Sequence, residues 1–204
     1  MALFDLDQAQ LVARLDPSAR GPVEGPSAAV AIVFRAGIDG TELLFIQRAS
    51  KESDPWSGHM AFPGGRTDAT DGDSHFTAER ETREEVGLDL SEAPRLGSLT
   101  DLEPGRQRGG LVAVRGHAYW LAGERPQLVP NYEVADTVWV PLRVLGDRDR
   151  YIDYYYPVSD STWPGIQLDN SSQVVWGLTL RFPSDLFRRL DQPFIELAPW
   201  PEAD

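Results

Sequence analysis

Three glutamates in the stretch Glu-Thr-Arg-Glu-Glu-Val-Gly have a spacing that can make a metal site. Glu81, Glu84 and Glu85 stand at positions i, i+3 and i+4. Because an α-helix turns by about 100° per residue, the three carboxylates fall in one narrow sector of a helix. Like charges at these offsets destabilise a helix by roughly 0.2–0.5 kcal/mol per pair, whereas a divalent cation would attract all three. The pattern predicts a site for Mg²⁺ or Mn²⁺; the alternative is a solvated, Glu-rich surface helix.

The helix that would carry these glutamates has signals for both of its ends. Asp73 or Ser74 is suited to cap its start, and Gly87 is suited to end it with a left-handed residue. Gly64 and Gly65 precede it and form a turn in which the backbone can come close to another group. A helix with defined ends beside a glycine turn predicts an ordered site.

A second face of the same helix is expected to pack against a sheet. Ala78, Thr82 and Val86 recur every four residues and give a small stripe that is mostly apolar. Arg80 lies four residues before Glu84 and is suited to orient a carboxylate through a bidentate hydrogen bond. The alternative for this pair is a weak surface contact.

Residues 65–88 resemble the Nudix box, the loop–helix motif of hydrolases that cleave nucleoside diphosphates linked to another group. In this resemblance Glu81, Glu84 and Glu85 match the metal-binding acids of the family, and Arg80 matches its orienting arginine. The resemblance therefore implies that these four residues are catalytic and that the three glutamates are the metal ligands.

The glycines of the box also match, and three positions depart from the family pattern. Gly65 and Gly87 stand where the family has glycines. Asp71 stands where the pattern has Glu, one extra residue precedes Arg80, and Thr82 fills an aliphatic position.

A longer signature resembles the coenzyme A pyrophosphatase-like subgroup of the family, which has the same one-residue expansion. One position and one segment differ from this subgroup: Ile46 replaces a Thr, and residues 53–56 stand where the signature has a second Arg before the spaced Gly. The matching residues are Leu43, Leu44, Arg48, Ala49, Gly58, Phe62, Pro63, Gly64, Gly65, Arg66, Asp68, Asp71, Val175, Trp176, Gly177, Leu178 and Thr179.

The resemblance implies a divalent-metal-dependent pyrophosphohydrolase with Mg²⁺ or Mn²⁺ as its cofactor. Coenzyme A or acyl-CoA is the favoured substrate, and ADP-ribose, nucleotide sugars, dinucleoside polyphosphates and nucleoside triphosphates are alternatives. A function of a different class is a non-catalytic Nudix-fold module that senses such a ligand. The intact set of three glutamates favours the enzyme.

The predicted substrate-binding residues are Arg48, Trp56, Gly64, Gly65 and Arg66. Arg48 ends a predicted strand, where it either binds phosphate in a bidentate manner or forms a strand-end salt bridge. Trp56 either stacks on a base or a pantetheine-like chain, or fills a gap in the core.

Several residues outside the box have a functional and a structural interpretation. Glu103 or Glu133 is either the proton acceptor or an ordinary loop carboxylate. His59 either titrates near neutral pH or is simply hydrogen-bonded. The run of tyrosines at 154–156, together with Trp163, forms a substrate wall, a dimer contact or ordinary packing.

Composition agrees with one globular domain. The 204 residues are 41% hydrophobic and 25% charged, and they include no cysteine, which excludes disulfides and thiolate metal sites. A net charge of −13 argues against a nucleic acid polymer as partner, because such binding uses clustered Lys and Arg. No signal peptide is evident at residues 1–7, and no apolar run is long enough to span a membrane. We expect a cytoplasmic protein that binds a small nucleoside diphosphate derivative, with a homodimer as one option for its assembly.

The element pattern predicts an α/β (α+β) fold, and the resemblance implies a Nudix-like α/β/α sandwich with a central mixed sheet. Residues 1–26 should form an N-terminal helix at 7–15 and a linker at 21–26, followed by a single domain at 27–204. Residues 106–110 are expected to be a mobile connection, residues 174–182 mainly helical, and residues 184–190 a helical continuation. Strands are expected at 28–34, 42–48, 96–100, 111–114, 117–121, 134–140, 151–156 and 166–168, and a loop at 49–59 leads through residues 60–62 to the glycine turn.

Overall fold

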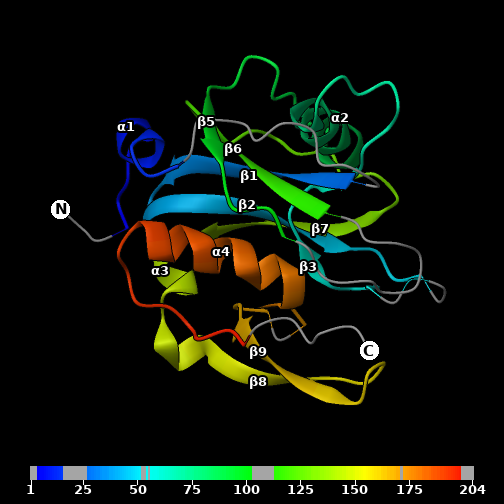
Figure 1. The fold of residues 1–204 in the computed structure, drawn as a ribbon, viewed down its shortest axis with the longest axis vertical. Helices are drawn as coiled ribbons and strands as arrows, with labels where there is room; N and C mark the ends of the chain where they lie inside the picture. Colours follow the sequence, from blue (N-terminus) through cyan, green and yellow to red (C-terminus); the bar gives the residue numbers. More distant parts are fainter. Residues whose placement is uncertain are drawn as a thin grey trace.

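A mixed β-sheet forms the centre of the protein in a computed structural model that describes residues 4–15, 27–51, 54, 56–102, 113–170 and 172–198 (Figure 1). Strands β3, β2, β1, β6 and β5 lie side by side in that order, while β4 also pairs with β1 and β7 with β2. The pairing of β1 with β6 is parallel, and β1 pairs antiparallel with β2 and β4. The strands are β1 (Ser27–Gly37), β2 (Gly40–Arg48), β3 (Met60–Ala61), β4 (Gly64–Arg66), β5 (Arg95–Ser98), β6 (Ala113–Leu121) and β7 (Val134–Pro141).

Helices cover both faces of this sheet. Figure 1 shows α2 on one side and α4 with α3 on the other. The mixed sheet between helices that the sequence predicted is therefore confirmed. The helices are α1 (Gln8–Val12), α2 (Ser74–Val86), α3 (Leu142–Leu145) and α4 (Gly177–Arg189), with a 3-10 turn at Arg148–Arg150.

Strand β1 separates two hydrophobic clusters because its side chains alternate between the two faces. Ala29, Ala31 and Val33 are buried in the cluster that contains residues of α2. Ile32 and Phe34 are buried in the cluster that contains residues of α4. Both helices therefore depend on the same strand for their packing.

The turn between β1 and β2 has the predicted hairpin form. Gly37 pairs with Gly40, and Ile38 and Asp39 make the turn between them. Gly40 has a φ of +94°, a conformation that residues with a Cβ rarely adopt.

A second sheet contains β8 (Tyr151–Tyr156), β9 (Ser161–Gln167) and β10 (Val174–Trp176), in the order β10, β9, β8. Its hairpin of β8 and β9 was predicted, although β9 begins earlier and ends earlier than the expected strand at 166–168. Figure 1 shows this hairpin beyond α4, away from the central sheet.

The prediction that residues 174–182 are mainly helical is wrong for their first part. Val174 and Val175 pair with β9 as a strand, which agrees with the β preference of branched side chains. Gly177 has a φ of +59° at the start of α4, so the chain changes direction there. The helix then continues to Arg189, as expected for residues 184–190.

The two strands expected on either side of Gly116 are one strand, β6, within the described residues. A Cβ on Gly116 would lie 2.7 Å from atoms of Ile32 and Phe182. The glycine therefore makes room on β6 for one side chain from the neighbouring strand β1 and one from α4, and it does not break the strand.

The N-terminal helix is shorter than predicted but is well anchored. Asp7 and Gln10 form a reciprocal capping box at the start of α1. Leu11 and Leu15 are buried in the same cluster as α4. The predicted linker at 21–26 and the predicted mobile connection at 106–110 lie outside the described residues.

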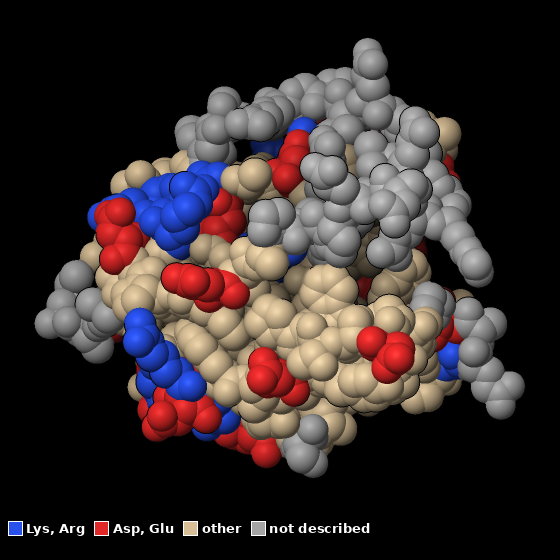
Figure 2. All heavy atoms as spheres, turned by 60° about the horizontal axis from the view of Figure 1, so that its bottom comes forward, with Lys and Arg blue, Asp and Glu red and all other residues tan. Residues whose placement is uncertain are grey.

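The distribution of charge is uneven over the surface. Figure 2 shows the side that carries β8 and β9, where Lys and Arg gather at one flank and acidic residues are scattered over the centre. Among the described helices, none has the length and apolar character needed to cross a membrane. The absence of a nucleic acid partner stays a prediction.

His117 joins the start of α2 to the sheet. Its buried ring lies 2.9 Å from the Ser74 hydroxyl and 3.3 Å from the Ser98 hydroxyl. Burial, together with the charges of Arg115 and His75, lowers the pKa of His117 from 6.5 to about 4. The ring is therefore neutral in the folded protein at pH 7.

We predict that acid weakens the fold through His117. Its folded-state pKa is below its unfolded value, so the unfolded chain binds the proton first as the pH falls from 6.5 to about 4. The lost stability approaches about 3 kcal/mol at the lower end of this window. Urea unfolding of the wild type and of His117→Gln over this pH window should show that the variant loses less free energy of unfolding as the pH falls. Their difference at pH 7 measures the packing and hydrogen bonds of the neutral ring. Parallel pH curves would contradict the prediction.

Candidate active site

Helix α2 holds the glutamates on a rigid support. Ala78, Thr82 and Val86 are fully buried, as the predicted stripe requires. Gly87 ends the helix with a φ of 70° in the left-handed region. Asp73 is at the N-cap position, but its side chain makes no capping hydrogen bond.

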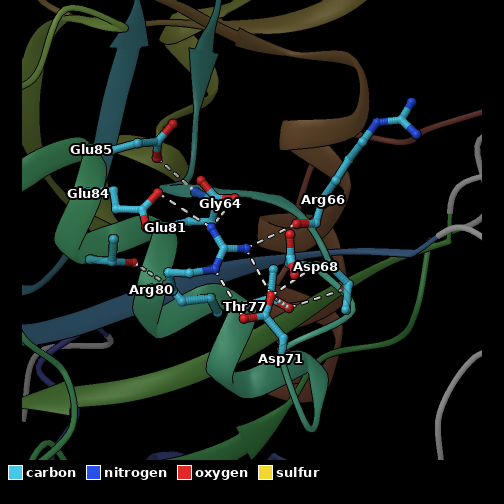
Figure 3. A network of polar contacts seen from close by, with 12 residues as sticks. Gly64, Arg66, Asp68, Asp71, Thr77, Arg80, Glu81, Glu84 and Glu85 are labelled. Carbon is cyan, nitrogen blue, oxygen red and sulfur yellow. Dashed lines mark hydrogen bonds and ion pairs between the residues drawn. The ribbon is translucent and has the colours of Figure 1, made fainter.

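The three glutamates point toward one region but have different surroundings (Figure 3). The side chain of Glu84 is 53% exposed, that of Glu81 is 18% exposed, and Glu85 is only 4% exposed as a residue. The three carboxylates therefore share one sector of the helix, as predicted, but burial increases from Glu84 through Glu81 to Glu85.

Glu85 is a buried carboxylate without an ion-pair partner among the described residues. One of its oxygens accepts a hydrogen bond from the backbone N–H of Gly64 at 2.9 Å. Burial, with the charges of Glu81 and Glu133, raises the pKa of Glu85 to about 8, against the opposing effects of the Gly64 hydrogen bond and the charge of Arg48. The protein thus holds an acidic group where its charge is poorly compensated.

Arg80 connects three carboxylates in the same network. Its Nε and Nη2 donate to the two oxygens of Asp71 at 3.1 and 2.9 Å, and its Nη1 donates to Glu81 at 2.9 Å. The contact with Glu84, which the sequence suggested first, is longer at 3.4 Å. Nη2 also donates to the backbone carbonyl of Arg66 at 3.2 Å. The bidentate partner of Arg80 is therefore Asp71.

Asp71 is an important residue of this network whose role the sequence did not indicate. It accepts hydrogen bonds from the Thr77 hydroxyl at 2.9 Å and from the backbone N–H of Asp68 at 3.0 Å. The hydrogen bond from Arg80 is the main reason that the pKa of Asp71 falls to about 2. An acid in the loop between the glycine turn and Arg80 was the available signal.

The two glycines of the turn have different neighbours. A Cβ on Gly65 would lie 2.5 Å from a carboxylate oxygen of Glu81. A Cβ on Gly64 would lie 2.3 Å from the carbonyl oxygen of Ala29 and 2.6 Å from the Cα of Val30. Gly65 therefore makes room for a glutamate side chain, whereas Gly64 makes room for the backbone of β1.

The other predicted substrate-binding residues surround this region without all meeting there. Arg48, at the end of β2, forms a salt bridge with Asp54 at 2.7 Å. Trp56 is 58% exposed and therefore does not fill a gap in the core. The side chain of Arg66 points away from the network in Figure 3. Substrate binding by these residues stays a prediction.

Of the two glutamates considered as an outside base, Glu133 is near the site, and Glu103 lies outside the described residues. The charge of Glu133 contributes to the raised pKa of both Glu81 and Glu85. Its own carboxylate contacts Lys51 at 3.1 Å.

The glycine turn and the acidic helix lie within a segment that matches a known family. Residues 25–160 match the family described as NUDIX domain, and this segment is more than half of the chain. The chain belongs to the NUDIX family. This confirms the resemblance drawn from the box residues.

Curated proteins and one solved structure resemble this NUDIX chain. Uncharacterized protein C14C4.10c of Schizosaccharomyces pombe is 31% identical over 176 residues, which are 78% of this chain and 49% of that protein. Human mitochondrial coenzyme A diphosphatase NUDT8 is 36% identical over 127 residues, which are 59% of this chain and 50% of that protein. The structure of a MutT/nudix family protein from Enterococcus faecalis has a TM-score of 0.56 at 18% identity and covers 85% of this chain and 65% of that chain, which shows a shared fold.

The NUDIX chain spans about half the length of these two curated relatives. The name of the human relative places that protein in mitochondria. The cytoplasmic location expected from the sequence therefore stays a prediction.

The donors of the Nudix box fit a hard divalent cation. Glu81, Glu84 and Glu85 offer carboxylate oxygens, and burial of Glu85 without a paired positive charge is what a cation would compensate. Within the described part of the chain, no three acidic or histidine side chains already surround a common metal position. The Glu85 carboxylate is turned to Gly64, and that of Glu81 is turned to Arg80.

We predict that Gly65→Ala in the Nudix box disturbs Glu81 and leaves the fold intact. The added methyl group meets only the end of a flexible side chain, so Glu81 must move. Mn²⁺ affinity measured by calorimetry should fall roughly 10- to 100-fold, with little change in melting temperature. Gly64→Ala is the contrast, because it meets the backbone of β1 and should destabilise the protein by about 1–3 kcal/mol. Unchanged Mn²⁺ affinity in Gly65→Ala would contradict the assignment of Glu81.

Proposed function

We propose that this NUDIX chain is a divalent-metal-dependent pyrophosphohydrolase that cleaves the diphosphate of a nucleoside diphosphate linked to another moiety. The observation that carries the proposal is the buried carboxylate of Glu85, held against Gly64 beside Glu81 and Glu84. A purely structural helix gains nothing from a buried acid without a partner, whereas a metal site needs one. The family match and the coenzyme A diphosphatase among the relatives support the same reaction class.

Each part of the network has a proposed role in this reaction. Glu81, Glu84 and Glu85 hold Mg²⁺ or Mn²⁺, which, when bound, screens the phosphate charges and lowers the pKa of the attacking water. Arg80, fixed by Asp71, holds Glu81 in position. Gly64 and Gly65 hold the turn close to β1 and to Glu81, so that backbone borders the proposed diphosphate site at the turn.

The proton of the attacking water needs an acceptor near the metal-binding carboxylates. One candidate is an oxygen of Glu84 or Glu85 that the metal leaves free. Glu133 is the candidate outside the box, because its charge already acts on Glu81 and Glu85. The backbone N–H of Asn131 donates to the carbonyl of Glu85 at 2.8 Å, so the segment that carries Glu133 is joined to the end of α2.

Coenzyme A or acyl-CoA is the substrate that we favour. The subgroup signature and the human relative support it. Asp54 stands in the segment that replaces an arginine of the subgroup signature, where a free negative charge would repel the substrate's phosphates. In the structure Arg48 pairs with Asp54 and compensates that charge. We assign this activity to a single domain of residues 27–204 that follows an N-terminal segment at 1–26.

A non-catalytic ligand-binding module is the second candidate function. It is favoured by the absence, among the described residues, of three side chains already arranged around one metal position. Both candidate functions require binding of the nucleoside diphosphate derivative, but only the enzyme cleaves it.

We predict that the purified chain releases 3′,5′-ADP and 4′-phosphopantetheine from coenzyme A in the presence of Mg²⁺ or Mn²⁺. Mass spectrometry of a panel that includes coenzyme A, acetyl-CoA, ADP-ribose and a dinucleoside polyphosphate identifies the products. If the chain releases AMP from ADP-ribose and does not cleave coenzyme A, ADP-ribose replaces coenzyme A as the favoured substrate. Binding without any product would favour the ligand-binding module.

We predict that Glu84→Gln lowers turnover by at least about 100-fold, since a metal ligand is worth several kcal/mol at the transition state. The substitution keeps the size of an exposed side chain, so the melting temperature should not change. Glu92→Gln is the matched control, because it removes the same charge from an exposed position outside the box. Full activity of Glu84→Gln with Mg²⁺ would contradict the role given to the helix.

A further inference from the structure

Five aromatic side chains form a continuous group that the proposed chemistry does not use. We call this group the aromatic surface: His59, Tyr154, Tyr156, Trp163 and Trp176. The ring of Trp176 is central, with centroids 4.7 Å from both Tyr154 and Tyr156, 4.8 Å from His59 and 6.4 Å from Trp163. Four of the rings come from the three strands of the second sheet, and His59 comes from the loop before β3.

The aromatic surface lies on the face of the second sheet that is turned away from the core. Tyr154 pairs with Trp163, whereas Ile166 pairs with Val175 on the opposite face, inside the main hydrophobic cluster. Gly165 lies between Trp176 and Tyr154 and has no side chain, so the rings of Trp176 and Tyr154 meet across it. All five aromatic side chains remain partly exposed to solvent.

Arg48 and the residues before β3 connect this surface to the candidate active site. The backbone N–H of Arg48 donates to the carbonyl of His59 at 3.0 Å, and the Thr179 hydroxyl donates to the carbonyl of Met60 at 3.0 Å. The charge of Arg48 lowers the pKa of both Glu85 and His59, so Arg48 lies within electrostatic reach of the carboxylates and of the aromatic surface. A ligand with its diphosphate at the Nudix box and another group at the rings would therefore lie close to Arg48.

The charges around the surface restrict what it can bind. Asp54, the acid that acts electrostatically on both His59 and Tyr156, is paired with Arg48, so its charge is compensated where it faces these rings. Burial lowers the pKa of His59, which keeps its ring neutral at pH 7. The surface therefore suits an uncharged planar group.

We propose that the aromatic surface binds the nucleobase of the substrate by stacking, while the diphosphate lies at the Nudix box. This inference rests on the proposed function for the position of the diphosphate. Stacking of a base on an aromatic side chain is worth about 1–3 kcal/mol and requires a flat partner. A neutral imidazole also offers one donor and one acceptor, which match the polar edge of a base and not an aliphatic arm.

The test compares AMP with ribose 5-phosphate, two ligands that differ only in the base. Calorimetry with Mg²⁺ should show that the wild type binds AMP about tenfold or more tightly than ribose 5-phosphate. Trp176→Leu and, as a second variant on the outer strand β8, Tyr154→Leu should lose most of this preference. Trp176→Phe keeps an aromatic face and should retain it.

Tyr155→Leu is the matched control, because Tyr155 is an exposed tyrosine on the opposite face of β8. It should leave the preference for AMP unchanged. Equal affinity of the wild type for the two ligands, or an unchanged preference in folded Tyr154→Leu and Trp176→Leu, would overturn the inference. If the wild type hydrolyses coenzyme A but shows no preference for AMP, the inference fails and the proposed function stands. If the wild type prefers AMP but cleaves no diphosphate, only the proposed hydrolase activity is refuted.

Discussion

The acidic groups that meet beside α2 outnumber the cations paired with them among the described residues. Arg80 is one cation shared among Asp71, Glu81 and Glu84, and Glu85 has only a backbone N–H from the glycine turn. Such an arrangement persists only if packing elsewhere holds it, because repulsion and desolvation both oppose it. The apolar side of α2 provides this support where Ala78 and Val86 are buried against β1.

The parts of the site that were predicted from the sequence are those set by local geometry. The helix period alone places Glu81, Glu84 and Glu85 in one sector, and Gly87 alone marks the helix end. The partner of Arg80 was missed because Asp71 reaches it through a loop whose path depends on tertiary contacts. The strand at Val174 and Val175 was missed for a similar reason, since three residues become a strand only when β9 lies beside them.

The two halves of the chain supply different parts of the proposed binding region. The Nudix box and the glycine turn come from the first half, whereas four of the five aromatic residues come from the second sheet. Met60 joins them, because β3 pairs with β2 and its carbonyl accepts a hydrogen bond from Thr179 near the start of α4. A change in β3 would therefore affect both the carboxylates and the rings.

The parallel pairing of β1 and β6 has a consequence for how the protein is made. Ser27 pairs with Ala113, so during synthesis on the ribosome one edge of β1 waits for a partner until the whole of α2 and β5 has been translated. The β1–β2 hairpin forms from neighbouring residues and is available early, whereas closing the long loop to β6 is slow. Until then the apolar strand resembles an open sheet edge, which makes this interval the stage of biogenesis most exposed to aggregation.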